Sequence, residues 1–422
     1  MMTSVRATLF TAVFIQPSVS HPLYDFRPFQ VEPTLRRTRT TLLALLIGSI
    51  LPTTADAEGN QWHDRLEPTG SFRLRYEDIL TSSESEDTRK EGFLIRLRAG
   101  FDYEIKKDRF KVGVQLRSGD PENPVSDNRA IQGLNTDDFS IKEAWLDFTP
   151  AKDLDLRFGM FEPRRLWKVS DLQWDNDVTV TGALQEIRPK QGSGVLDLLG
   201  FSFYQYLLER SQEGDAWLLG AQVRPELILD DSNKLNLGAE FDYYGNPQSI
   251  VDLSLTGQLK GNKITNLLDE DNHLISDFRV ASLFAEWSNT SSARWPLHLA
   301  AYYYKNLGAG DEVGTETGIS GARAHAGEND TAIFARAETG RYDQLGHVQV
   351  RYTYYQSEPD ALLYAYMQSD TKRASNLKGS RGDLWIGLIS RTFLHITYYR
   401  TRALIGARST IHSWFFDYVI RF

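Results

Sequence analysis

The feature that most constrains this chain is an alternation of apolar and polar residues that dominates from Phe72 to Phe422. In residues 93–106 the odd positions are apolar and the even positions are mostly charged. A period of two residues indicates β-strands that have one apolar and one polar face. The mean hydropathy is −0.40, and the longest apolar run, residues 42–51, is far shorter than the about 20 residues that a transmembrane helix needs.

About sixteen strands can be counted in this pattern, and their connections alternate between long segments, such as 119–138, and tight turns, such as Lys107-Asp108. Outer-membrane barrels have short periplasmic turns, long extracellular loops and an even number of strands. A closed barrel also removes the free edges of so large a sheet. We therefore predict an all-β fold, a transmembrane antiparallel β-barrel of about 16 strands, although the pattern does not distinguish 16 from 18. The expected strands lie near 71–79, 92–106, 109–118, 139–149, 153–161, 179–188, 196–208, 216–229, 233–244, 277–288, 294–305, 330–339, 346–356, 382–391, 393–402 and 410–422.

The first 57 residues are expected to lie outside this fold. A basic segment with Arg36, Arg37 and Arg39 precedes the apolar run 42–51, and Ala55-Asp56-Ala57 follows it. These three parts in this order are typical of a secretory signal peptide. Because too many residues precede Arg36, we interpret residues 1–57 as a start site assigned too early followed by a signal peptide cleaved near Ala57. Residues 58–422 then form the barrel.

Composition excludes several classes of function. The chain has no cysteine, which excludes a disulfide framework, a thiolate metal site and a cysteine nucleophile. Its net charge is −9, and removing residues 1–57, with five basic and three acidic residues, leaves 42 basic against 53 acidic residues and a net charge of −11. An acidic chain of this kind argues against nucleic acid as a partner.

The C-terminus resembles the signal by which the barrel-assembly machinery recognises outer-membrane proteins. Aromatic and aliphatic residues alternate backward from the terminal residue, namely Phe422, Ile420, Tyr418, Phe416 and Trp414. Other aromatic residues lie near strand ends and are expected to form belts at the two lipid–water boundaries. They are Tyr302, Tyr303, Tyr304, Tyr352, Tyr354, Tyr355, Tyr398 and Tyr399, together with Trp414 and Tyr418.

Several short segments resemble a known family of bacterial outer-membrane proteins, the "putative porins". They are 72–77 and 95–100, similar to the opening strands; 118–128, similar to the second long loop; 142–146 and 156–159, similar to the fourth and fifth strands; and 172–177 with Gly182, similar to a Trp-Asp-x-Asp loop. The resemblance is clearest over 70–185 and weak between 245 and 330. It implies passive transport through a barrel and names no solute.

Strand parity predicts a basic wall inside the barrel. If Phe72, Leu74 and Tyr76 face lipid, the polar residues between them face the lumen, because a charge on the lipid side costs about 2–4 kcal/mol near the midplane. Two interpretations stay open: a ladder of unneutralised cations that sets ion selectivity, or a wall whose cations are paired with carboxylates. The predicted wall comprises Arg73, Arg75, Arg96, Arg98, Arg117 and Arg157.

The loop after the fifth strand, residues 162–178, is the predicted constriction. In sixteen-stranded porins the loop at this place commonly folds inward. Here it carries Asp171, Trp174, Asp175 and Asp177, whose carboxylates would face the basic wall across the channel. The alternative is an extracellular loop that lies outside the pore.

No catalytic constellation is evident. The eight histidines show no metal-ligand spacing, and the common hydrolase motifs are absent. Asp269-Glu270-Asp271 could bind calcium, but a solvated loop is the simpler interpretation. We therefore expect no enzyme activity, no cofactor and no bound metal.

The sequence predicts a channel in the bacterial outer membrane for passive diffusion of small hydrophilic solutes. The alternatives are a ligand-specific exporter or channel for anionic polysaccharide or carboxylated solutes, and a barrel-anchored enzyme or adhesin without an open pore. The expected partners are outer-membrane lipid, the barrel-assembly machinery and the solutes, with a homotrimer as the usual assembly of such barrels. The sequence does not specify the solute, the gating or the oligomeric state.

Overall fold

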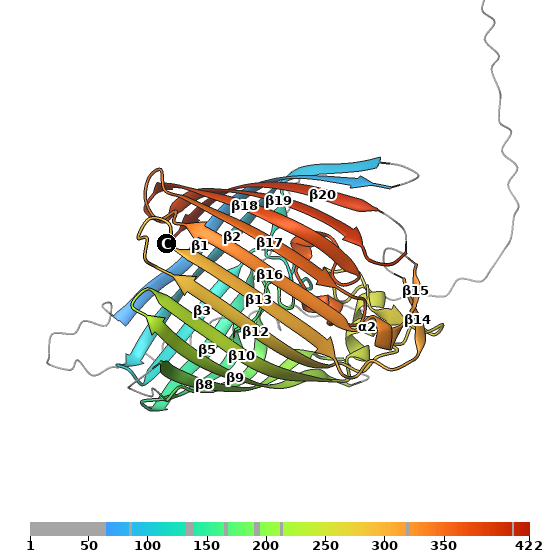
Figure 1. The fold of residues 1–422 in the computed structure, drawn as a ribbon, viewed down its shortest axis with the longest axis horizontal. Coiled ribbons are helices and arrows are strands. Elements are labelled where there is room, and N and C mark those ends of the chain that lie inside the picture. The colour runs from blue at the N-terminus through green and yellow to red at the C-terminus, as the bar shows by residue number, and fades with distance from the viewer. Residues whose placement is uncertain are drawn as a thin grey trace, which may run out of the picture. The chain divides into compact units, whose positions relative to one another are not determined.

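The described residues of the computed structural model, 65–83, 87–131, 139–163, 168–189, 195–211, 214–317, 321–406 and 409–422, form a closed antiparallel β-barrel (Figure 1). Sixteen strands make up its wall, as the sequence predicted. Each wall strand pairs with the next one along the chain, and the first pairs with the last, which closes the sheet. The predicted signal peptide, residues 1–57, lies outside the described residues.

The wall strands are β1 (Leu66–Ser82), β2 (Asp87–Lys106), β3 (Phe110–Arg117), β5 (Ser140–Ala151), β6 (Leu154–Phe161), β7 (Val180–Ile187), β8 (Leu196–Glu209), β9 (Ala216–Asp230), β10 (Asn233–Gly245), β12 (Arg279–Asn289), β13 (Leu297–Asn306), β16 (Thr331–Gly340), β17 (Val348–Ser357), β18 (Leu377–Ile389), β19 (Thr392–Ala403) and β20 (Thr410–Arg421). Between them lie short elements: β4 (Arg129–Ala130), α2 (Gln248–Leu255), β11 (Leu267–Leu268), β14 (Val313–Glu316), β15 (Arg323–His325) and the 3₁₀ turns η4 (Ala326–Glu328), η5 (Tyr364–Tyr366) and η6 (Ser369–Thr371).

The register shows why the alternation in the sequence is so regular. Phe72 is paired with Leu97 on one side and with Ile420 on the other, and Arg75 is paired with Asp417. Residues that are directly opposite in neighbouring strands share a face of the sheet. Apolar side chains therefore form a continuous outer surface, where Leu283 is 61% exposed, and charged side chains collect inside.

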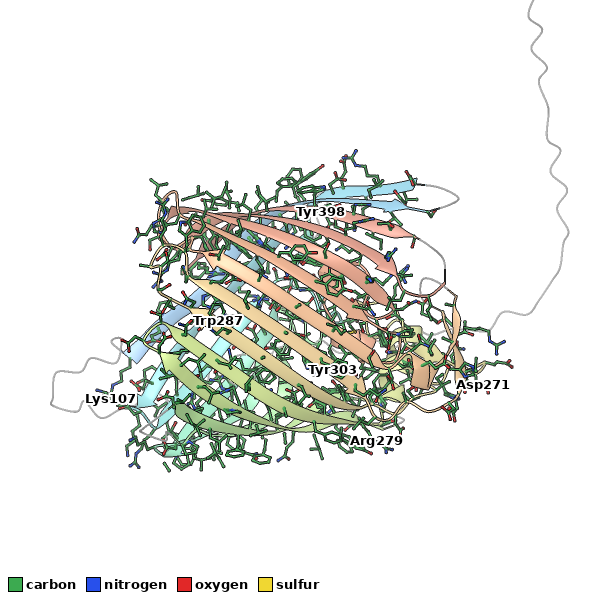
Figure 2. All side chains as sticks on the ribbon, viewed as in Figure 1. Lys107, Asp271, Arg279, Trp287, Tyr303 and Tyr398 are labelled. Atoms are coloured by element: carbon green, nitrogen blue, oxygen red, sulfur yellow. The ribbon has the colours of Figure 1, made fainter. Side chains whose placement is uncertain are left out.

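The two ends of the barrel differ in their connections. Lys107 lies at the end that carries tight turns, whereas Asp271 and Arg279 lie at the end that carries long loops (Figure 2). The tight turns require unusual backbone geometry, since Asp108 and Arg391 have φ angles of 57° and 61°. One predicted long loop, 82–90, is mostly strand, because β1 and β2 stay paired as far as Ser82 and Asp87.

The predicted aromatic belts are partly wrong. Tyr302, Tyr304, Tyr355 and Tyr399 are buried and face inward. Their neighbours in the chain face outward, because successive side chains of a strand point to opposite faces. The outward aromatic residues include Tyr303, Tyr352, Trp414 and Tyr418, which are 37–57% exposed.

The interior of the barrel contains a packed core. Long loops contribute the fully buried side chains of Trp174, Tyr364 and Met367, and wall strands contribute Tyr204 and Tyr304. No helix among the described residues has the length and apolar character needed to cross a membrane. Side chains of the inward loops and of the wall strands therefore meet in the lumen.

Candidate functional site

The arginines of the predicted basic wall are directed into the barrel. Arg73 and Arg75 lie on β1, Arg96 and Arg98 on β2, and Arg117 on β3, so that three neighbouring strands bring them together. The side chains of Arg75 and Arg117 are 3% and 8% exposed, and those of Arg96 and Arg98 are 14% exposed. Carboxylates of inward loops and of the last strand contact these cations.

The sixth predicted arginine lies apart from this group. Arg157 on β6 forms an ion pair with Asp147 of the adjacent strand β5. Its guanidinium also stacks on the ring of Trp145, 4.2 Å from the ring centre. These partners belong to the wall, so Arg157 contributes to the wall rather than to the group on β1–β3.

Two aspartates from different loops bind the arginines of β2 and β3. Asp127 accepts hydrogen bonds from Arg117 at 2.7 Å and from Arg98 at 2.5 Å, and the fully buried Lys142 lies 3.3 Å away. Asp177 accepts hydrogen bonds from Arg98 at 2.5 Å and from Arg96 at 3.2 Å. The backbone N–H of Asp127 donates to the Asp177 carboxylate at 3.1 Å, which joins the two loops.

The arginines of β1 bind a third loop and the last strand. Arg75 donates two hydrogen bonds to Asp417 of β20, at 2.7 and 2.9 Å, and two to Asp370, at 2.9 and 3.1 Å. Arg73 donates to the side chain of Asn128 at 2.5 Å. Two parallel charge-assisted hydrogen bonds between a guanidinium and a carboxylate hold both groups in one orientation and also stabilise the pair.

We call this set of side chains the charged junction. It comprises the cations Arg73, Arg75, Arg96, Arg98, Arg117 and Lys142 and the carboxyl groups of Asp127, Asp175, Asp177, Asp370 and Asp417. Its cations outnumber its carboxyl groups. Its carboxyl groups come mostly from loops, whereas its cations come from the wall.

Two aspartates of the 168–178 loop have opposite pKa shifts. Burial would raise the pKa of Asp177, but the charges of Arg98 and Arg96 outweigh it and hold this pKa well below its usual range. Burial, followed by the charges of Asp177 and Asp370, raises the pKa of Asp175 to about 7. Asp175 nevertheless accepts hydrogen bonds from the backbone N–H and the hydroxyl of Ser369, at 2.8 and 2.9 Å.

The 168–178 loop crosses the lumen. Besides its contacts with β2, it touches strands on other sides of the barrel: Asp171 lies 3.6 Å from Arg381 on β18, and Gln173 donates to Asp242 on β10 at 2.9 Å. Trp174 is completely buried and stacks on Tyr366, with ring centres 5.2 Å apart. The predicted constriction residues Asp171, Trp174, Asp175 and Asp177 are thus all placed inside the barrel.

Two further loops fill the lumen, and the sequence analysis did not identify them. Asn262 of the 246–278 loop donates to the carbonyls of Tyr364 and Met367, at 2.9 and 2.7 Å. Asn266 donates in the same way to Leu362, at 2.9 Å. The signal that could have revealed the 358–376 loop is its apolar run 361–367, which would be costly in a solvated loop.

A cavity opens at the short-turn end of the barrel. It has a volume of about 820 Å³ and its lining includes Glu338, Arg341, Gln349, Arg391 and Arg421. Groups of both charges line this cavity, so it is compatible with water and polar solutes. In the described part of the chain, no group of three or more acidic or histidine side chains is placed to hold a metal ion.

The predicted assembly signal lies on the closing strand. Trp414, Phe416 and Tyr418 of β20 are exposed on the outer face, as their parity requires. The backbone of Phe422 exchanges two hydrogen bonds with Gly70, at 3.0 and 3.1 Å. The last residue of the chain is therefore attached to the first strand.

The comparisons with known proteins agree with this architecture. Residues 83–264 and 263–422 match the model of a family described as "Putative porin". Among solved structures, the chain is similar to OprB of Pseudomonas putida, with a TM-score of 0.51, 9% identity and coverage of 92% of this chain and 97% of that one. It is also similar to Salmonella typhi OmpF, with a TM-score of 0.49, 11% identity and coverage of 85% and 99%. No curated protein matches the sequence.

Proposed function

Because the chain belongs to the putative porin family, we propose that it is an outer-membrane channel that lets small hydrophilic solutes diffuse through a lumen narrowed by the charged junction. The observation that carries this proposal is the meeting of the 118–128, 168–178 and 358–376 loops on the arginines of β1–β3. Inward loops of this kind make the narrowest part of the path a charged one.

The packing of the loops supports small solutes over polymers. The stacked pair Trp174 and Tyr366 and the hydrogen bonds of Asn262 and Asn266 fill the centre of the barrel. An extended polysaccharide would have to displace this packed core, whereas a small solute needs only local rearrangement. The exporter of anionic polysaccharide is therefore the weaker candidate.

The charge of the junction supports a preference for anionic or carboxylated solutes among the small ones. The high pKa of Asp175, raised to about 7 by burial and nearby carboxylates, reduces the negative charge of the junction near neutral pH. Charges within a narrow, low-dielectric channel act at short range and with little screening. The acidic residues of exposed loops are screened beyond about 8 Å at physiological ionic strength.

Conductance in planar bilayers tests the proposal. We expect ohmic steps from the purified barrel, and liposomes that contain it should swell in small neutral or carboxylated sugars but not in dextran. Small steps that only a charged polysaccharide blocks would favour the exporter. Absence of conductance from correctly folded barrel would favour the adhesin or enzyme and overturn the proposal. The homotrimer and signal-peptide cleavage near Ala57 stay predictions.

A further inference from the structure

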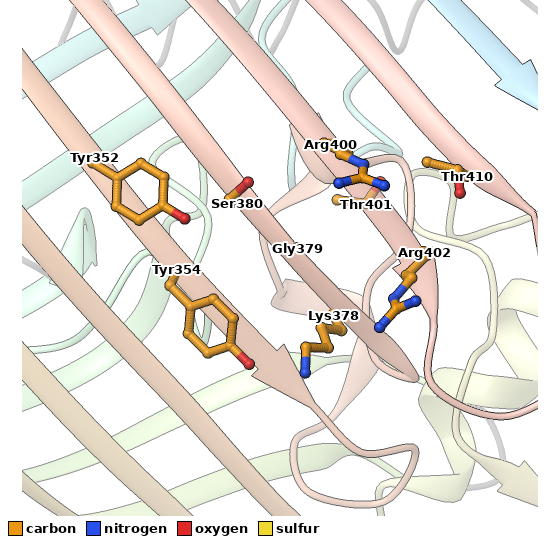
Figure 3. Close-up of a pocket in the computed structure, with 9 residues that line it drawn as sticks. All are labelled: Tyr352, Tyr354, Lys378, Gly379, Ser380, Arg400, Thr401, Arg402 and Thr410. Carbon is orange, nitrogen blue, oxygen red and sulfur yellow. The ribbon is translucent and has the colours of Figure 1, made fainter.

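A pocket lies on the outer face of the barrel, away from the lumen. It has a volume of about 270 Å³ and is formed by β17, β18, β19 and the start of β20. Figure 3 shows the side chains of Lys378, Arg400 and Arg402 on one side of the pocket and those of Tyr352 and Tyr354 on the other. We call Lys378, Arg400 and Arg402 the outer basic cluster.

The register places the outer basic cluster on the lipid side of the wall. Lys378 is directly opposite Arg402, and Ser380 is directly opposite both Arg400 and Tyr354. The same face continues through Tyr352, which is 57% exposed. Arg400 and Arg402 are themselves exposed, so all three cations point away from the lumen.

The three cations have no carboxylate partner in the part of the chain that the structure describes. Lys378 lies over the ring of Tyr354, with its nitrogen 5.9 Å from the ring centre. By contrast, Arg279, another outward cation at the long-loop end, forms an ion pair with Asp277 at 2.6 Å. An uncompensated group of three positive charges on a surface attracts an anionic partner.

The position along the strands fixes the depth of the cluster in the membrane. Arg402 is the penultimate residue of β19, and Lys378 is the second residue of β18, so both lie at the long-loop end. Tyr398 lies on the same face, two residues deeper than Arg400 and about 7 Å from it along the strand, and it packs against Trp414 with ring centres 4.6 Å apart. Leu394 and Ile396 follow on β19 toward the short-turn end.

This order places the cations next to an aromatic belt, on the side away from the aliphatic zone. Aromatic belts mark the level of the lipid headgroups, and long loops face the cell exterior. A cation costs far less free energy there than at the midplane of the bilayer. The cluster therefore lies at the level of the headgroups of the outer leaflet.

We propose that the outer basic cluster binds a phosphate group of an outer-leaflet glycolipid. This inference rests on the outer-membrane location of the family but not on any channel property. Arginine guanidinium groups match the oxygens of a phosphate in paired hydrogen bonds. The hydroxyls of Ser380 and Thr410 line the same pocket and can donate to the remaining oxygens, and Tyr352 offers its ring to the sugar.

Native mass spectrometry of the detergent-purified full chain, titrated with lipid A, tests the proposal. The variant is Lys378→Gln/Arg400→Gln/Arg402→Gln, and the control is Arg279→Gln, whose cation is already paired with Asp277. Each of the three cations can donate charge-assisted hydrogen bonds to the phosphate, and the variant loses all of them. We expect the triple variant to bind lipid A at least about tenfold more weakly, and Arg279→Gln to bind it as the wild type does.

Two further titrations separate the sources of the ligand, and heat-modifiable mobility and conductance show that the variants fold. Dephosphorylated lipid A should bind no better to the wild type than to the triple variant. Equal binding of dephosphorylated and phosphorylated lipid A by the wild type would overturn the proposal. Binding of inorganic phosphate as tightly as lipid A would assign the site to a free anion instead. If the wild type binds no lipid and is an oligomer, while the triple variant is a monomer, this face would be a contact between subunits instead.

Discussion

Replacing Asp177 by asparagine should loosen the loop that crosses the lumen. The carboxylate of Asp177 is the one group of the 168–178 loop that binds Arg96 and Arg98 together, at 3.2 and 2.5 Å. It also accepts the backbone N–H of Asp127. Asparagine keeps the size of the side chain but removes the charge and one acceptor oxygen.

The magnitude follows from the burial of this pair. The side chains of Asp177 and Arg98 are 8% and 14% exposed, and removing one partner of a buried ion pair costs about 3–5 kcal/mol. Because Asp127 continues to neutralise Arg98, we take the lower end, about 3 kcal/mol. At 1.4 kcal/mol per tenfold, the equilibrium between the packed and the displaced loop shifts roughly a hundredfold.

Single-channel recording under a KCl gradient measures this effect. We expect the Asp177→Asn variant to conduct more, and its reversal potential to move toward anion preference because the arginines lose a counter-charge. A variant that is folded by heat-modifiable mobility but has the conductance and reversal potential of the wild type would refute the reasoning. It would mean that Arg96 and Arg98 neither hold the loop nor line the path.

Asp175→Asn is the matched comparison, two residues away in the same loop. The pKa of Asp175 is raised from 3.8 to about 7 by burial and by the charges of Asp177 and Asp370. The stability that protonated Asp175 gives to the packed loop is therefore complete below pH 3.8, and it is lost as the pH rises through 7. Wild-type conductance should thus increase from pH 4 to pH 8, and that of Asp175→Asn should increase less; an equal increase in both would contradict this.

Three further predictions concern charge, assembly and export. The Arg96→Gln/Arg98→Gln variant should shift the reversal potential toward cation preference, because Asp127 and Asp177 then face fewer cations. An unchanged reversal potential in a variant that still conducts would mean that these arginines do not set the ion selectivity. Phe422→Asp should lower the outer-membrane yield of heat-modifiable barrel, whereas Phe422→Tyr should not, and equal yields would argue against the terminal assembly signal. Intact mass spectrometry of the protein from outer membranes should find a chain that begins at Glu58, and retention of residues 1–57 would disprove cleavage near Ala57.

The wall of the barrel could be predicted from the sequence because its rule is local. Because Phe72, Leu74 and Tyr76 alternate with Arg73 and Arg75, the sequence of this one strand predicts which side chains face inward, whatever its distant partners are. The same rule should have assigned Tyr302 and Tyr304 to the inner face, since the outward Tyr303 lies between them. That error came from treating a run of aromatic residues as one belt.

The contents of the lumen could be predicted only in part. The inward course of the 168–178 loop was expected from its place after the fifth strand, but the binding of Asp370 to Arg75 joins residues 295 positions apart and has no local pattern. The hydrogen bond that Asn266 donates to the carbonyl of Leu362 also joins distant parts of the sequence and has no local pattern. The apolar run 361–367 showed that this loop needs burial, but not where it is buried.

The hydrogen bonds between the first and the last wall strand determine which pairing of the barrel forms last. Arg75 and Asp417 are 342 residues apart, and Gly70 is joined to Phe422, which directly follows the last wall strand, β20. One side of β1 therefore stays unpaired until β20 has been synthesised and exported, and closing so long a loop is slow. Until that moment the chain carries a free strand edge, which invites aggregation. A cell that destroys chains with such an edge removes every copy that ends before β20, because each of these lacks the partner of its own first strand.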